Sequence, residues 1–465
     1  MLSVRRLDIL PDPEGAFVHV YGASPNAFWL DSSAAGERGR FSFMGDASGP
    51  LGAVVTYDVN AGRLRVERRD GVEERGESIF DFLGRETQHL RDPGPGSELP
   101  FDFDGGFAGY LGYELKAECE GAAAHRASTP DAALIFADRL LAFDHHEGHT
   151  YLLSITEADP WIEETGQRFA ALPPLAEPRL DASPPELVLR RSRRRYREDI
   201  AACQRYLIAG HSYEICLTNK LGGETAAEPL ELYRALRRAN PAPFSAYLRF
   251  GGLAVLSSSP ERFLAVDRNG QAEARPIKGT SRRGETPAED ARLATALRSG
   301  EKSRAENVTI VDLLRNDLGR VCELGSVEVP ELMRVESYET VHQLVSSVRG
   351  RLRDHLGSAD CVRACFPPGS MTGAPKLRTM EIIDELESEA RGVYSGAIGW
   401  FGRGGACDLS VSIRTIVLDR GAATIGAGGA IVVDSDPEEE FEEILLKARA
   451  PISAFESRTS LLGQT

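Results

Sequence analysis

The segment Ala274–Thr280, which reads Ala-Arg-Pro-Ile-Lys-Gly-Thr, carries the lysine whose surroundings point most directly to chemistry. Lys278 lies between a short strand-like run and Gly279, where the lack of a side chain lets the backbone approach a ligand closely. A lysine amine that loses its proton through burial becomes a nucleophile. The alternative is an exposed lysine at a strand end, which is the commoner case for any single lysine.

Three ionisable residues near the C-terminus are spaced so that they share one face of a helix. Glu440 and Glu443 are three residues apart, and Lys447 follows four residues later. A hard cation such as Mg²⁺ usually takes one or two protein carboxylates together with substrate oxygens. Glu306, on another predicted helix, is a candidate for a further ligand. The alternative is a solvated acidic helix start, which the helix dipole favours.

Two runs of small residues and one arginine suit an acidic ligand. The segment 366–376, Phe-Pro-Pro-Gly-Ser-Met-Thr-Gly-Ala-Pro-Lys, ends at a predicted helix N-terminus, where free amides attract anions. The segment 427–430, Ala-Gly-Gly-Ala, follows a predicted strand and offers further amides. Arg414 lies within a predicted strand, and a carboxylate ligand is a candidate partner for it. These features together predict a site for a small dicarboxylate.

The composition of the 465-residue chain is that of a globular protein, with 42% hydrophobic and 27% charged residues. A formal net charge of −16 argues against nucleic-acid binding. No apolar run has the length of a membrane span, and the N-terminus lacks the apolar core of a signal peptide. Seven irregularly spaced cysteines argue against a disulfide framework. We therefore expect a protein of the reducing cytoplasm.

The elements that must position these residues are predicted from periodicity and turn residues. Helical spacing predicts helices over 196–210, 301–318, 375–389 and 438–455. Residues 253–266 predict two strands that meet at a Ser-Ser-Pro turn, and residues 394–433 predict three strands in an antiparallel meander. Strands and helices do not alternate regularly, so the expected fold class is α+β with mainly antiparallel sheets.

Prolines concentrate in residues 173–193, which predicts a linker. We expect an N-terminal region over 1–172 that packs on the catalytic part, and a catalytic domain over 194–460.

From about residue 196 to 455 the chain resembles the chorismate-utilising enzymes, which include anthranilate synthase component I, aminodeoxychorismate synthase component I, and the isochorismate and salicylate synthases. The motifs occur in family order and comprise Ser258–Phe263, Pro276–Thr280, Ala305–Asp317, Gly369–Lys376, Ser412–Thr415 and Asp434–Glu440. The N-terminal part matches more loosely, through Trp29–Ser33, Arg40–Gly45 and a Phe-Asp-Gly-Gly segment. The resemblance implies an anthranilate synthase component I-like fold, with antiparallel sheets packed as a sandwich and flanked by helices.

Within this family the residue between Pro-Ile and Gly-Thr separates the branches. Anthranilate-type enzymes carry alanine there, whereas lysine, here Lys278, marks the aminodeoxychorismate synthases. The resemblance implies Mg²⁺-dependent conversion of chorismate and ammonia to 4-amino-4-deoxychorismate, for para-aminobenzoate and folate synthesis. The lysine amine would add at C2 and expel the C4 hydroxyl, and ammonia would then add at C4 and expel the lysine. The alternatives are an anthranilate or isochorismate synthase and a catalytically inactive binding subunit.

The resemblance also implies roles for individual residues. Glu261 matches the general acid that protonates the departing hydroxyl. The implied Mg²⁺ ligands are Glu306 and Glu443, with Glu440 nearby. The positions that match the substrate pocket are Tyr394 and Arg414, which bind the enolpyruvyl carboxylate in the family, and Thr280, Ser370, Gly428, Gly429 and Lys447.

The chain departs from the family pattern at two places. Many relatives carry histidine where this chain has Gln343; either His342 compensates or Gln343 donates the hydrogen bond instead. The last glycine of the family's small-residue run is Ala430 here. Glu214, where several relatives have Gln or Lys, receives no role.

Two further expectations concern partners and regulation. No Gly-x-Cys-x-Gly elbow of a glutamine amidotransferase occurs, so we expect a separate glutaminase subunit to supply ammonia. The Trp29–Ser33 segment is similar to the tryptophan-binding segment of anthranilate synthases, and we favour a structural role for it over a regulatory one.

Overall fold

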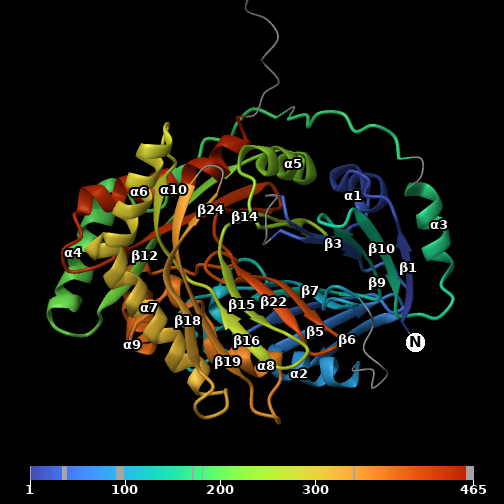
Figure 1. The fold of residues 1–465 in the computed structure, drawn as a ribbon, viewed down its shortest axis with the longest axis horizontal. Helices are drawn as coiled ribbons and strands as arrows, with labels where there is room; N and C mark the ends of the chain where they lie inside the picture. Colours follow the sequence, from blue (N-terminus) through green and yellow to red (C-terminus); the bar gives the residue numbers. More distant parts are fainter. Residues whose placement is uncertain are drawn as a thin grey trace, which may run out of the picture.

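The computed structural model describes residues 2–33, 39–90, 99–169, 172–180, 182–338 and 341–456. Two twelve-stranded antiparallel sheets form its centre (Figure 1). The first sheet contains, in spatial order, β1 (Ser3–Leu7), β10 (His149–Ser154), β9 (Arg139–Asp144), β3 (Phe41–Asp46), β2 (Asn26–Asp31), β13 (Phe244–Phe250), β14 (Leu253–Ser259), β23 (Thr415–Asp419), β24 (Ala422–Ile431), β12 (Glu214–Glu224) and β11 (Val188–Leu189), with β20 (Gly373–Ala374) also paired to β12.

The second sheet contains, in spatial order, β17 (Ile277–Arg282), β19 (Val341–Arg351), β16 (Gln271–Ala274), β15 (Arg262–Val266), β22 (Cys407–Val411), β21 (Ala397–Gly402), β7 (Gly106–Leu111), β8 (Ala132–Ala137), β4 (Ala53–Asp58), β5 (Arg63–Arg68) and β6 (Gly71–Arg75), with β18 (Glu328–Ser337) also paired to β19. The helices are α1 (Pro13–Tyr21), α2 (Ile79–His89), α3 (Pro160–Phe169), α4 (Arg193–Ile208), α5 (Pro229–Ala239), α6 (Pro287–Ser299), α7 (Glu301–Gly319), α8 (Ser358–Cys365), α9 (Lys376–Glu387) and α10 (Pro437–Ala454), with short 3₁₀ turns η1 (Tyr113–Glu118) and η2 (Gly369–Met371).

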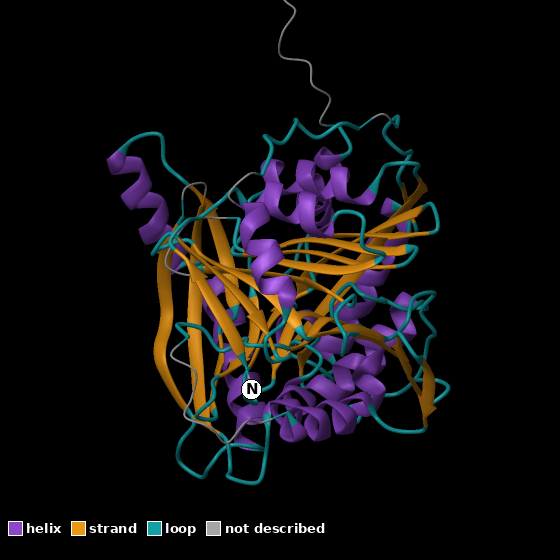
Figure 2. Cartoon of the chain, turned by 90° about the vertical axis from the view of Figure 1, so that its right-hand side faces the viewer, coloured by secondary structure: helices purple, strands orange, loops and turns teal. Residues whose placement is uncertain are grey.

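Apolar side chains fill three layers between and outside the sheets. An aromatic layer separates the two sheets, and its Phe103 and Trp400 rings stack with centroids 4.9 Å apart. Figure 1 shows α1, α5 and α10 outside the first sheet and α2 and α8 outside the second, and Figure 2 shows the same layers from the side. Central strands such as β7 and β14 are therefore buried along their whole length, because both faces are covered. This confirms the predicted α+β sandwich.

The N-terminal and C-terminal parts of the chain share both sheets. In the first sheet β2 pairs with β13, and in the second β7 pairs with β21. The described residues between α3 and β11 contain no helix or strand, which agrees with the proline content there. The boundaries at 172 and 193 stay predictions.

The four predicted helices are confirmed as α4, α7, α9 and α10. Within α7, Val311, Leu314 and Leu318 are buried, whereas Val308 is 50% exposed. Among the described residues, no helix combines the length and the hydropathy that a membrane span requires.

The prediction for 394–433 is wrong in its topology. The segment forms four strands, of which β21 and β22 belong to the second sheet and β23 and β24 to the first. The chain therefore crosses between the sheets after β22, and Arg414 lies in that crossing, not in a strand. The two strands predicted over 253–266 exist as β14 and β15, but they too lie in different sheets. Strand periodicity shows where strands lie and carries no information about which sheet accepts them.

Candidate active site

The two crossings between the sheets lie side by side and bring Glu261 and Arg414 together. The amide of Val411 donates to the Glu261 carbonyl oxygen at 2.9 Å, and the amide of Ser258 donates to the Arg414 carbonyl oxygen at 3.2 Å. Arg414 has a φ of +52°, in the left-handed region that a non-glycine residue rarely adopts. Such strained residues concentrate at functional sites, where the surrounding structure enforces them.

Glu261 is a buried carboxyl group with 7% of its surface exposed. Burial raises the pKa of Glu261 to about 7, against the lowering effects of the Ser370 hydroxyl and the Lys278 ammonium. A carboxyl group with this pKa still carries a proton near neutral pH. It can therefore donate a proton to a departing group.

Lys278 on β17 is paired with Glu214, the first residue of β12, across the gap between the two sheets. The Lys278 Nζ donates to Glu214 Oε1 at 2.5 Å, and the two residues are 7% and 1% exposed. Burial alone would lower the pKa of Lys278, but Glu214 and then Glu306 outweigh burial and raise the pKa above its usual value. The expectation that burial deprotonates this lysine is therefore wrong for the ligand-free protein. The sequence analysis gave Glu214 no role. Glu214 and Lys278 lie 64 positions apart on strands of different sheets, so no local sequence pattern indicates their pairing.

A buried Arg391–Glu387 pair joins three walls of this site. The Arg391 guanidinium donates to both Glu387 carboxylate oxygens at 2.7 and 2.8 Å. It also donates to the carbonyl oxygens of Met371, beside Ser370, at 2.6 Å and of Cys216 on β12 at 2.8 Å. The pair thus fixes the segments that carry Ser370 and Glu214. It also fixes the segment of Tyr394, which follows Arg391 by three residues. The sequence analysis missed it.

Tyr394 and Arg414 form a polar wall that suits an anion. Burial lowers the pKa of the Arg414 guanidinium below its usual value, partly offset by Tyr394 and Glu443, which are its electrostatic neighbours. No hydrogen bond or ion pair of this guanidinium is found among the described residues. A Cβ atom at Gly426 would lie 2.2 Å from the Tyr394 ring, so only glycine leaves room for the ring there.

A family model described as chorismate binding enzyme matches residues 27–453, which include every one of these groups. The chain belongs to the chorismate binding enzyme family.

Two relatives and one crystal structure illustrate the similarity. The chain is 48% identical over 471 residues to the aminodeoxychorismate synthase of Streptomyces pristinaespiralis, covering 97% of this chain and 65% of that relative. It is 40% identical over 371 residues to the aminodeoxychorismate synthase component 1 of Salmonella typhimurium, covering 78% of this chain and 79% of that relative. The crystal structure of anthranilate synthase component I from Streptococcus pneumoniae matches with a TM-score of 0.77 at 31% identity, covering 89% of this chain and 92% of that one. The predicted fold is confirmed, and the chain spans less than two thirds of the Streptomyces relative.

The three glutamates implied as metal ligands in this chorismate binding enzyme lie on α7 and α10. Glu443 Oε1 accepts from Lys447 at 2.6 Å, and Glu440 Oε1 accepts from Lys302 at 3.0 Å. Burial raises the pKa of Glu306; Lys278 opposes this rise, whereas the charges of Glu214 and Glu443 add to it. Glu440 is 2% exposed, which excludes a solvated helix start for this residue.

These carboxylates fit Mg²⁺ through one or two protein ligands, not through a closed cage. Among the described residues, no three His, Cys, Asp or Glu side chains lie close enough to hold one ion between them. Mg²⁺ commonly keeps waters and takes substrate oxygens beside one or two carboxylates. Glu440 Oε2 is buried, and the described part of the chain offers it no hydrogen-bond partner, as expected for an oxygen that receives a ligand.

The remaining predicted pocket residues lie at three different places. Ser370 is buried, and its hydroxyl lies beside the Glu261 carboxyl group, whose pKa it lowers. Gly428 and Gly429 lie inside β24, not after a strand as predicted, and pair with β12. The ladder between β23 and β24 ends at Ile425, so one edge of this part of β24 has no strand partner among the described residues. Lys447 donates to the Gly428 carbonyl oxygen at 2.8 Å, whereas Thr280 is exposed.

Either His342 or Gln343 was expected to replace the histidine of many relatives, and the structure shows the partners of His342. Its Nε2 lies 2.9 Å from Asp290 Oδ1 on α6, and its Nδ1 lies 2.7 Å from the Ser337 hydroxyl. Both ring nitrogens are therefore engaged in holding α6 and β18 against β19. Gln343 is buried and pairs in register with Thr280 of β17, which places it beside the lysine strand.

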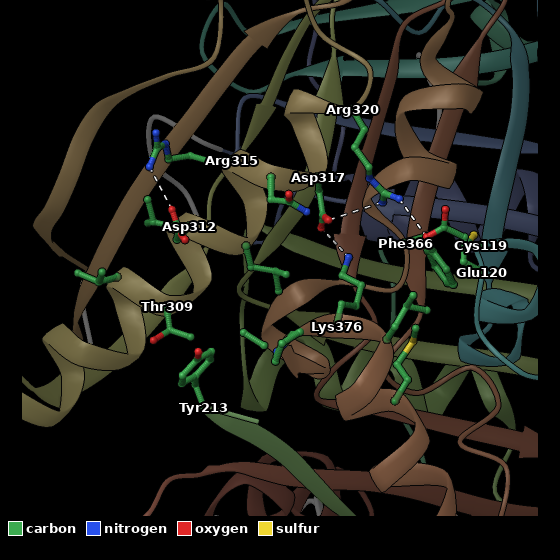
Figure 3. A pocket seen from close by; sticks show the side chains of 18 of the residues that line it. Cys119, Glu120, Tyr213, Thr309, Asp312, Arg315, Asp317, Arg320, Phe366 and Lys376 are labelled. Carbon is green, nitrogen blue, oxygen red and sulfur yellow. Dashed lines mark hydrogen bonds and ion pairs between the residues drawn. The ribbon is translucent and has the colours of Figure 1, made fainter. Parts of the chain in front are cut away.

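Two cavities of the molecule contain none of the predicted site residues. A groove of about 850 Å³ lies along α7 and α9, and Figure 3 shows Lys376 reaching Asp317 in it. The Lys376 Nζ also donates to the Cys365 and Pro367 carbonyl oxygens at 2.6 and 3.0 Å, so this end of the small-residue segment is a structural anchor.

A second cavity of about 470 Å³ lies between the sheets beside Asp31 of the Trp29–Ser33 segment. The structural role expected for that segment, in preference to a regulatory one, stays a prediction.

Proposed function

We propose that this chain is the synthase component that converts chorismate and ammonia to 4-amino-4-deoxychorismate. The observation that carries the proposal is the buried Lys278, held 2.5 Å from a carboxylate and electrostatically coupled to the buried acid Glu261. The name of the Streptomyces relative, which shares 48% identity, supports the same reaction. The product suits para-aminobenzoate and folate synthesis, because the amine sits at C4 and a lyase then removes pyruvate.

The first half of the reaction uses Lys278 as nucleophile and Glu261 as acid. Lys278 transfers its proton to Glu214 Oε1, and the neutral amine then attacks C2 of the ring. The C1–C2 and C5–C6 double bonds shift, and the C4–O bond breaks. Glu261 gives its proton to the oxygen, which leaves as water. This step forms a C2–N bond and leaves Glu261 as a carboxylate.

The second half reverses the double-bond shift. Ammonia attacks C4, the C2–N bond breaks, and its electron pair returns to Lys278. The new C4 ammonium passes a proton to Glu261, which restores the acid, and Glu214 returns its proton to Lys278. The net change is chorismate plus ammonia to the 4-amino product plus water.

The other predicted residues bind and orient the substrate. Arg414 and Tyr394 suit the enolpyruvyl carboxylate, since a guanidinium that has no hydrogen-bond or ion-pair partner among the described residues gains most from an anionic ligand. Ser370, Gly428, Gly429, Thr280 and Lys447 are proposed to line the pocket. Glu306 and Glu443, with Glu440 nearby, would hold Mg²⁺, which when bound neutralises the ring carboxylate.

We propose that ammonia comes from a separate glutaminase subunit in the cytoplasm. The designation component 1 of the Salmonella relative supports a partner subunit. All seven cysteines of the chain are free thiols, which suits a reducing compartment.

The product identifies the reaction. Purified protein with chorismate, Mg²⁺ and ammonium should yield an amine that keeps its enolpyruvyl group, detected by mass spectrometry. Intact-protein mass spectrometry should show an adduct of chorismate less one water, absent from Lys278→Ala. Anthranilate with pyruvate, or isochorismate, would establish one of the alternative synthases. Unchanged turnover by Lys278→Ala would exclude the covalent route.

A further inference from the structure

The carboxylates of α7 and α10 have a cationic side chain of the protein beside them. Lys302 lies one turn before Glu306 on α7, and its Nζ donates to Glu440 Oε1 at 3.0 Å. Glu306 and Glu443 are the next electrostatic neighbours of this ammonium group. Lys302 therefore faces all three glutamates that are proposed to serve Mg²⁺.

Two carboxylate oxygens of this cluster converge on one point beside β24. A Cβ atom at Gly429 would lie 3.0 Å from Glu440 Oε2 and 3.8 Å from Glu443 Oε1, so glycine keeps this space open. Glu440 is 2% exposed, and the described ranges contain no hydrogen-bond partner for its Oε2. A buried carboxylate oxygen without a partner is costly, so this oxygen is expected to receive a cation.

Lys302 is held less firmly than Lys447, the second lysine of the cluster. Lys447 donates to Glu443 Oε1 at 2.6 Å and also to the Gly428 carbonyl oxygen at 2.8 Å, and its side chain is 34% exposed. For Lys302, Glu440 is the only hydrogen-bond partner found in the described part of the chain, and its side chain is 54% exposed. A half-exposed lysine with one partner can turn into water at little cost.

We propose that Lys302 is a displaceable counter-ion of the Mg²⁺ site. This inference rests on the metal ligands of the proposed function. Lys302 neutralises Glu440 when no metal is bound. Mg²⁺ at Glu440 Oε2 and Glu443 would drive the ammonium group away, because two cations on one carboxylate repel each other. Lys302 thereby competes with the metal and sets the Mg²⁺ concentration at which the site fills.

The test is urea unfolding of EDTA-treated protein over a series of Mg²⁺ concentrations at constant ionic strength. Mg²⁺ that binds only the folded state raises the free energy of unfolding, and the concentration dependence of this rise gives the Kd for Mg²⁺. Lys302→Met removes the ammonium group and should lower this Kd about 5-fold, the equivalent of one ion pair with a half-exposed lysine. Lys302→Arg keeps a cation and should stay near wild type.

Arg304→Met is the matched control for the loss of positive charge. Arg304 is exposed on α7 two positions after Lys302, and residues two apart on a helix do not share a face. This variant removes the same charge from the same helix without removing the contact with Glu440. Its Kd for Mg²⁺ should therefore stay near that of wild type.

Each result supports or overturns the role of Lys302. A Kd that falls in Lys302→Met and not in Arg304→Met supports a displaceable counter-ion. A raised Kd overturns it, because Lys302 then orients Glu440 for the metal. An unchanged Kd, or an equal fall in both variants, also overturns it, because the contact with Glu440 then does not compete with Mg²⁺. If Mg²⁺ stabilises neither wild type nor any variant, the metal ligands of the proposed function fail together with this inference.

Discussion

The buried pair of Lys278 and Glu214 can be tested by removing its cation. In Lys278→Met, the Glu214 carboxylate loses a partner 2.5 Å away and stays in a position that is 1% exposed. Removing one partner of a buried ion pair costs about 3–5 kcal/mol, because the remaining charge stays desolvated. We expect a loss within this range at about pH 8, because the Glu306 charge, which repels the Glu214 carboxylate, also remains.

The double variant Lys278→Met/Glu214→Gln is the matched control for this measurement. It leaves no uncompensated charge at the pair, so its free energy of unfolding should lie closer to that of wild type. The free energy of unfolding of the single variant should also change with pH, whereas that of the double variant should not change in this way. In the unfolded chain this glutamate has an ordinary pKa of about 4.3 and loses its proton above that pH. In the folded single variant the buried carboxylate is expected to keep the proton at such pH values. The folded state then holds more protons, so stability falls as pH rises from about 4 towards neutrality.

Urea unfolding followed by tryptophan fluorescence at about pH 5 and about pH 8 measures both effects. The separation between single and double variants should be larger at the higher pH. Equal unfolding free energies for the two variants at both pH values would refute the reasoning, because Glu214 would then be solvated once Lys278 is gone.

Three further predictions concern the catalytic groups. Glu261→Gln should lower turnover about 100-fold or more, the usual contribution of a general acid, and should prevent the lysine adduct; in wild type, turnover should fall as pH rises through about 7, where Glu261 loses its proton. A full yield of adduct in Glu261→Gln would contradict that assignment. Arg414→Met should raise the KM for chorismate about 10- to 100-fold, and an unchanged KM would remove Arg414 from substrate binding. EDTA should abolish turnover and Mg²⁺ should restore it, with Glu443→Gln requiring more Mg²⁺ than the exposed control Glu442→Gln; equal requirements would count against Glu443 as a ligand.

Local sequence features predicted the elements better than their assembly. The helical periodicity of α7 and α10 and the Ser-Ser-Pro turn between β14 and β15 were enough to place these elements, because each depends on residues within a few positions. The exposed Val308 of α7 and the left-handed Arg414 were not predictable in this way. Both depend on which neighbouring element covers or constrains the residue.

The motifs of the chain by themselves determined its family and named Lys278, Glu261 and the glutamates of α7 and α10 as candidates, because residue types in order are what a family shares. Only the tertiary structure decided that Lys278 is held as an ammonium by Glu214, and that Glu261 and Arg414 lie at adjacent crossings between two sheets. The physical reason is that pKa and partner choice depend on burial and distance. Glu214 and Lys278 are 64 positions apart in the chain and belong to different sheets, so only folding brings them into contact.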